Sequence, residues 1–250
     1  MITIRPCTLC IALACMVLPA VSFGDTVYTD GTFNLSDYTN PFTIQTGPMT
    51  GVVSQCSSCG NPGQALSTLF TLTTPNPASS SLEIGLLNMN FTYTPSIQGA
   101  IGSIDASVDN STSSIFVSSY NLFRPLIEQD GNFYDAEILA GPGNAGFVNL
   151  SESLSASDFL QLDTSTGLTI PGSDPNFGGD TMEFGLIVSD GSIALPSFTQ
   201  TIIYDNLTFD LAPVPEPGSM VPMAMALAWL AIHLRKRHRK TTPNTNPLSD

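Results

Sequence analysis

Cys56 and Cys59 form a Cys-x-x-Cys pair, the residue spacing in this chain that most directly suggests chemistry. A structural zinc site needs about four ligands, but residues 25–212 contain no histidine and no further cysteine. A redox-active pair normally lies at a helix N-terminus, where a thiol pKa is lowered, whereas Gly60-Asn61-Pro62-Gly63 is a turn sequence. We therefore expect a local disulfide that holds a loop in an oxidising compartment.

Catalysis in this segment would have to depend on carboxylates alone. Both histidines, His233 and His238, lie near the C-terminus, so residues 25–212 cannot form a Ser-His-Asp or Cys-His site. Glycosidases place two carboxylates on either side of the scissile bond, and the nearest pattern is Asp135-Ala136-Glu137 with Glu128 and Asp130 upstream. This pattern is weak. We expect a protein that is not an enzyme and keep a carboxylate-only glycosidase as a less favoured alternative.

Two turns rich in oxygen ligands could hold calcium, which prefers carboxylate and carbonyl oxygens. Neither has EF-hand spacing, and Asp and Asn also favour turns for backbone reasons. The turn interpretation is favoured, so no cofactor is required and calcium remains an alternative. The candidate ligands are Asp130, Asn132 and Asp135 in one turn and Asp174, Asn176 and Asp180 in the other.

Acidic residues dominate the central part of the chain. Between residues 25 and 212 there are nineteen Asp or Glu residues and one basic residue, Arg124, for a net charge of about −18. Binding to nucleic acid needs clustered Lys and Arg, so this composition excludes it. A net charge of this size favours solubility.

Apolar and polar residues alternate with a period of two in several segments, as expected for strands with one buried face. Turn sequences separate them, including Asp30-Gly31, Asp130-Gly131 and Asp190-Gly191. Residues 155–162 could form one short helix. We therefore predict an all-β, antiparallel sandwich. Its inward-facing sets are Met89, Phe91 and Tyr93; Ile104, Ala106 and Val108; Met182, Phe184, Leu186 and Val188; and Leu207, Phe209 and Leu211.

Both ends of the chain carry hydrophobic segments. Residues 1–24 have one basic residue, an apolar run and small residues before Asp25, which is typical of a secretory signal peptide. The apolar run from Ser219 to Leu234 would be about 24 Å long as a helix, which is marginal for a hydrocarbon core of about 30 Å. The basic residues that follow would stay on the cytoplasmic side. They are Arg235, Lys236, Arg237, Arg239 and Lys240.

The order of Pro215-Glu216-Pro217, an apolar helix and a basic cluster resembles the PEP-CTERM sorting signal of Gram-negative and related bacteria. The resemblance covers residues 213–240 and leaves a polar tail, residues 241–250, which family members usually lack. It implies export through the secretory translocon, transient anchoring in the inner membrane and processing by an exosortase-like protease. The destination would be the cell surface or an extracellular matrix linked to exopolysaccharide and biofilm.

The body, residues 25–212, also resembles a concanavalin/laminin-G-like jelly roll that recurs in exported PEP-CTERM proteins. The resemblance implies that the first strand, near Val27 to Phe33, pairs with the last, near Thr201 to Leu211. The segments that carry it are Asn61-Pro62-Gly63-Gln64-Ala65-Leu66, the run from Tyr93 to Asp109, Asp174-Pro175-Asn176-Phe177 and Tyr204-Asp205-Asn206.

These observations favour a non-enzymatic surface or matrix protein. The alternative is a lectin-like module, with or without calcium, that binds polysaccharide. That alternative predicts aromatic side chains that face solvent beside an acidic loop. The candidates are Tyr120, Phe123, Phe133 and Tyr134.

Overall fold

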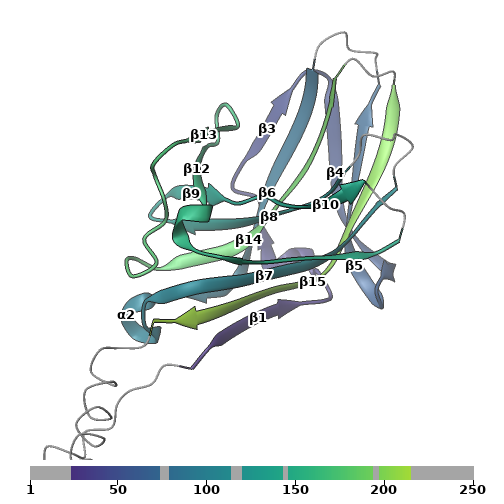
Figure 1. The fold of residues 1–250 in the computed structure, drawn as a ribbon. Helices are drawn as coiled ribbons and strands as arrows, with labels where there is room; N and C mark the ends of the chain where they lie inside the picture. Colours follow the sequence, from purple (N-terminus) through teal and green to yellow (C-terminus); the bar gives the residue numbers. More distant parts are fainter. Residues whose placement is uncertain (1–23, 74–78, 114–119, 143–145, 194–196, 215–250) are drawn as a thin grey trace, which may run out of the picture. The chain divides into compact units, whose positions relative to one another are not determined.

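A computed structural model describes residues 24–73, 79–113, 120–142, 146–193 and 197–214, and Gly24–Val214 is one compact unit. Its strands form two antiparallel sheets that share one hydrophobic core (Figure 1). The predicted all-β class and antiparallel sandwich are therefore confirmed.

The first sheet has six strands in the order β11-β7-β15-β5-β4, with β1 also beside β15. The strands β1, β15 and β7 lie side by side in Figure 1. Because β1 pairs with β15 from Thr26 opposite Leu211 to Asp30 opposite Leu207, the expected pairing of first and last strands is confirmed. The bounds are β1 Thr26–Asp30, β4 Met49–Gly60, β5 Gly63–Leu72, β7 Ile101–Ser113, β11 Val148–Leu154 and β15 Phe198–Pro213.

The second sheet has nine strands in the order β13-β12-β9-β8-β14-β6-β2, with β10 beside β8 and β3 beside β6. Two 3-10 turns, η1 Leu35–Asp37 and η2 Ala156–Asp158, and one short helix, α2 Pro95–Gln98, connect strands. The bounds are β2 Tyr38–Thr39, β3 Thr43–Thr46, β6 Ser79–Tyr93, β8 Tyr120–Gln129, β9 Asn132–Asp135, β10 Ile138–Pro142, β12 Leu160–Asp163, β13 Leu168–Ile170 and β14 Met182–Ile193.

The core lies between the sheets, and most predicted inward-facing residues are buried in it. The sets from β7, β14 and β15 are each 0 to 1% exposed. A bulge in β15 keeps its inward face continuous, because the register shifts between Asp205 and Thr208 and Asn206 adopts φ 51°. Both Tyr204 and Leu207 therefore point inward although they are three residues apart.

Met89 is an exception to the predicted inward set. It is 49% exposed, while Phe91 and Tyr93 are buried. The cause is an irregularity where β6 pairs with β14, because Thr92 lies opposite Glu183 but Leu87 lies opposite Gly185. The extra residues of β6 interrupt the alternation and place Met89 outside the core.

A second, smaller apolar cluster lies outside the main core. It consists of Phe42, Ile44, Leu87, Leu126, Leu162 and Ile187. Ile187 lies between inward-facing Leu186 and Val188 on β14, so this cluster covers the opposite face of the second sheet.

The turn predictions had mixed outcomes. Asp130-Gly131 is a two-residue hairpin turn between β8 and β9, with φ of 53° and 76°. Asp190-Gly191 is not a turn, because β14 continues through it to Ile193, paired with β6. The expected short helix within residues 155–162 is reduced to the turn η2, with Ser155 and Asp158 forming a capping box, and β12 begins at Leu160.

In the part of the chain that the structure describes, no helix has the length and apolar character needed to cross a bilayer. The predicted signal peptide lies outside the described residues, as do the motif Pro215-Glu216-Pro217, the apolar run and the basic cluster.

Candidate functional site

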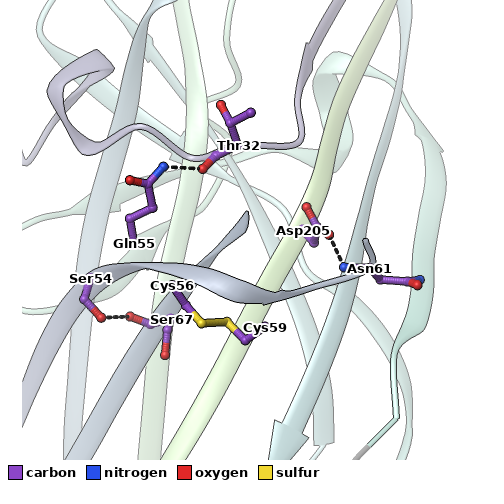
Figure 2. Close-up of a disulfide and its surroundings, with 8 residues drawn as sticks. All are labelled: Thr32, Ser54, Gln55, Cys56, Cys59, Asn61, Ser67 and Asp205. Carbon is purple, nitrogen blue, oxygen red and sulfur yellow. Dashed lines mark hydrogen bonds between the residues drawn. A yellow bond between two sulfur atoms is a disulfide. The ribbon is translucent and has the colours of Figure 1, made fainter. Parts of the chain in front are cut away.

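Cys56 and Cys59 are joined by a disulfide near the end of β4, with their Cα atoms 5.7 Å apart (Figure 2). The predicted pairing is confirmed. No helix follows the pair, because β4 turns through Asn61 and Pro62 directly into β5. The disulfide therefore fastens the end of a hairpin.

A polar network holds this hairpin end against β15. The backbone N–H of Asn61 donates to the carboxylate of Asp205, which is fully buried (Figure 2). The Asn206 side chain donates to the Asn61 carbonyl and to Asp109, both at 2.9 Å. Asn149 on β11 donates to the other oxygen of Asp109 at 2.9 Å. Three of the segments that carry the jelly-roll resemblance therefore lie next to one another. Their polar groups form hydrogen bonds within the protein.

The first set of calcium candidates does not converge. Asp130 forms the tip of the β8–β9 turn, and Asn132 donates to its carbonyl at 3.3 Å. Asp135, at the other end of β9, is buried and forms an ion pair with Arg124. Glu128, one of the carboxylates considered for catalysis, accepts from the Gly131 N–H at 2.7 Å.

The second set of calcium candidates is organised by a neutral side chain. Gln129 donates to the carbonyls of Asn176 and Asp180 at 2.9 and 3.0 Å and accepts from the Asn176 N–H at 2.8 Å. These bonds fix the shape of the loop through its backbone. Within the described ranges there is no group of three or more His, Cys, Asp or Glu side chains suited to a metal ion.

Arg124 is buried, and its two ion-pair partners could not be identified from the sequence. It bonds Glu83 on β6 and Asp135 on β9, each at 2.8 Å. Burial raises the pKa of Asp135, and the charge of Arg124 acts against this. The one basic residue of the body is thus an internal ion pair partner for two carboxylates.

Two of the aromatic residues considered for carbohydrate stacking are buried, and a third is partly buried. Phe123 is fully buried in the core, and Tyr134 is 7% exposed. Phe133 is partly buried and packs edge-on against Phe42, with ring centroids 5.1 Å apart. The side chain of Tyr120 lies outside the described set. The prediction of exposed aromatics is therefore wrong for Phe123 and Tyr134, which pack in the core, whereas Phe133 keeps part of its ring exposed.

A groove of about 440 Å³ opens where edges of the two sheets meet, and we call it the sheet-edge groove. In the described part of the fold, β4 is an edge strand of the first sheet and β2 and β3 are edge strands of the second. The buried residues Leu82, Ile84 and Leu86 of β6 form its apolar bottom. The other lining residues are Leu35, Tyr38, Thr39, Asn40, Thr43, Gln45, Thr50, Gly51 and Val53.

The polar side chains of the groove are held in place by their own hydrogen bonds. Tyr38 donates to Asp30 at 2.9 Å. Burial raises the pKa of the Tyr38 phenol well above its usual value, and the charge of Asp30 adds to the shift. Gln45 donates to the Met49 carbonyl at 2.8 Å, and Asn40 donates to the Thr43 hydroxyl at 3.3 Å.

These bonds leave hydrogen-bonding capacity on side chains that line the groove. The Asn40 and Gln45 amides use their N–H groups, so their oxygens can still accept, and the Thr43 hydroxyl can still donate. Groove-lining hydroxyls and amides above an apolar bottom suit a ligand that has both hydroxyl groups and apolar C–H surface. No sequence motif indicated this groove, because its residues come from η1, β2, β3, β4, β6 and the loop between β2 and β3.

No family model matches the chain, and no curated protein matches it. Among solved structures, it is similar to a family 11 carbohydrate-binding module from Clostridium thermocellum in complex with a β-1,3-1,4-mixed-linked tetrasaccharide. That likeness has 15% identity and a TM-score of 0.39, and covers 78% of this chain and 99% of the module.

A second likeness is to the C-terminal family 22 carbohydrate-binding module of Clostridium thermocellum Xyn10B. It has 12% identity and a TM-score of 0.34, and covers 74% of this chain and 93% of the other. At these values no ligand and no function follow from either likeness.

Proposed function

We propose that this chain is an exported, non-enzymatic protein of the cell surface or extracellular matrix whose β-sandwich binds polysaccharide in the sheet-edge groove. The observation that carries the proposal is the lining of the groove. Amide oxygens and hydroxyls on β2, β3, β4 and the loop between β2 and β3 surround an apolar bottom formed by β6. A sugar ring presents hydroxyls at its edge and C–H groups on its faces, so it can satisfy both kinds of surface.

The sorting part of the proposal is supported by sequence features at the two ends. Residues 1–24 have the composition of a signal peptide, and Pro215-Glu216-Pro217 precedes an apolar run and a basic cluster. We propose that the signal peptide directs the chain to the translocon and that an exosortase-like protease acts near the motif. The body would be a jelly roll of the kind found in other exported PEP-CTERM proteins.

Binding is tested on a glycan array, with and without a calcium chelator, using the exported, processed protein. The variant Asn40→Ala/Thr43→Ala removes two polar groups of the groove, and we expect about tenfold weaker binding. Ser151→Ala, at an exposed position of β11 away from the groove, is the control and should bind like the wild type. Absence of any binding under both conditions would leave a purely structural matrix role. Binding that vanishes with the chelator would favour the calcium-assisted alternative.

Processing is tested by mass spectrometry of the mature C-terminus. The proposal expects a terminus near Pro215-Glu216-Pro217 on the exported protein. Exported protein that still carries residues 235–250 would contradict it.

A further inference from the structure

The sheet-edge groove lies in a part of the chain that carries no charge. None of its lining side chains is ionised at neutral pH. In the sequence, no Asp, Glu, Lys, Arg or His occurs from Tyr38 to Leu82, which includes all of β3, β4 and β5. This segment contrasts with the rest of a body whose net charge is about −18.

The body has no spare cation for an acidic ligand. Arg124 is its one basic residue, is 6% exposed and is paired with both Glu83 and Asp135. Recognition of carboxylate, sulfate or phosphate groups normally requires Arg or Lys, or several converging N–H groups. Moving Arg124 to a ligand would leave two carboxylates unpaired, one of them buried, which is strongly unfavourable.

A second hollow in the described part of the body would repel an anionic polymer. A hollow of about 490 Å³ on the outer face of the first sheet is lined in part by Asp105, Glu152 and Asp210. Asp105 and Asp210 are directly opposite each other on β7 and β15. Like charges in this position repel each other and any approaching anion.

We infer that the groove selects neutral polysaccharides and rejects those that carry uronate, sulfate or phosphate groups. This inference rests on the proposed function and adds the class of ligand. Neutral glycans need only the hydroxyl and amide groups that the groove presents, so their binding does not depend on charge. Such binding should not change with salt concentration, whereas binding driven by ion pairs would weaken as salt is added.

The test uses affinity electrophoresis of the exported, processed protein through gels that contain one polysaccharide each. This form lacks the basic residues 235–240, which could bind an acidic probe independently of the groove. The neutral probes are xylan, mixed-linkage β-glucan and galactomannan, and the acidic probes are alginate, polygalacturonate and hyaluronate. Each gel is run with EDTA or with calcium, in 20 mM and 500 mM NaCl. We expect retardation by at least one neutral probe in every condition and no retardation by an acidic probe in any.

Two charge variants make the test sharper. Thr43→Lys places a cation in the groove, and we expect at least one acidic probe to retard this variant in 20 mM NaCl although it does not retard the wild type. Thr29→Lys changes the net charge by the same amount, but Thr29 is an exposed residue of β1, which pairs with β15. We expect this variant to bind the same probes as the wild type.

The outcomes separate the two claims. Wild-type protein that binds an acidic probe, with or without calcium, would overturn the selectivity and leave polysaccharide binding intact. Acidic binding that appears equally in Thr29→Lys and Thr43→Lys would also overturn it, because the groove would not be the determinant. Failure of the wild type and both variants to bind any probe would overturn the proposed function itself.

Discussion

Arg124 has the largest predicted effect among single residues, because it neutralises two carboxylates inside the second sheet. Replacing it with Met removes both ion pairs, at 2.8 Å each, and leaves buried Asp135 without its partner. Breaking a buried pair on one side costs about 3–5 kcal/mol. We expect Arg124→Met to lower the free energy of unfolding in urea by this amount.

A compensated variant controls for the loss of packing. In Arg124→Met/Glu83→Gln/Asp135→Asn no uncompensated charge remains, so most of the stability should return. A loss below about 1 kcal/mol in Arg124→Met alone would show that the triad is not important for folding.

Asp190 should make the stability depend on pH. Burial raises the pKa of its carboxyl from 3.8 to about 6, and one carboxylate oxygen is buried without a hydrogen-bond partner. Because the folded state favours the protonated form, the wild type gains stability as pH falls through 6 towards 4. The full effect is up to about 3 kcal/mol.

The check compares wild type with Asp190→Asn in urea at pH 4 to 7. The variant should be the more stable protein at pH 7, and the difference should shrink as pH is lowered. Parallel stability curves for the two proteins across this range would contradict the assignment.

Single residues were also where sequence-based prediction was least successful. The alternation in β14 and β15 identified buried side chains correctly, because alternation depends on nearest neighbours in the strand. Arg124 has two partners: Asp135 lies on β9, the next strand along the chain, but Glu83 lies on β6, 41 residues away in the sequence. The burial of Phe133 likewise depends on a distant residue, because its ring packs against Phe42.

At the scale of elements, close contact between β6 and the chain before β3 holds the second apolar cluster together. A Cβ atom on Gly85 would lie 2.5 Å from the ring of Phe42, and the Gly85 N–H donates to the Phe42 carbonyl at 3.1 Å. Gly85→Ala must therefore displace the ring. We expect a loss of about 1–3 kcal/mol in the free energy of unfolding.

The variant Phe42→Leu provides the background that isolates this contact. Removing the ring should reduce the cost of Gly85→Ala, so the double-mutant cycle should show coupling of at least about 0.5 kcal/mol. Additive effects would indicate that the ring is not what limits the size of residue 85.

Strands and turns were largely predictable where residues close together in the sequence determine them. The Asp130-Gly131 turn follows from residues that tolerate positive φ. Met89 was predicted to face inward, but an irregularity in β6 changes which side chains do so. Asp190-Gly191 was predicted to be a turn, but β14 continues through these residues because it pairs with β6. Both errors come from pairing between strands, which alternation in one strand does not reveal.

At the scale of the whole molecule, charge is distributed unevenly. The segment from Tyr38 to Leu82 is uncharged and carries most of the groove, while acidic residues occur on the outer face of the first sheet. Composition alone predicted the acidic body. The groove could not be predicted, since it exists only where edges of two sheets meet.

The central claim is that polysaccharide binds in the sheet-edge groove, and a ¹H–¹⁵N NMR titration tests it most directly. The protein would be titrated in turn with xylohexaose, mixed-linkage glucan hexasaccharide and mannohexaose. We predict that at least one of them shifts the amide signals of Tyr38, Asn40, Gln45 and Gly51, while signals near Asp105 and Asp210 stay unchanged. Shifts confined to the outer face of the first sheet, or no shifts with any of the three, would contradict the account.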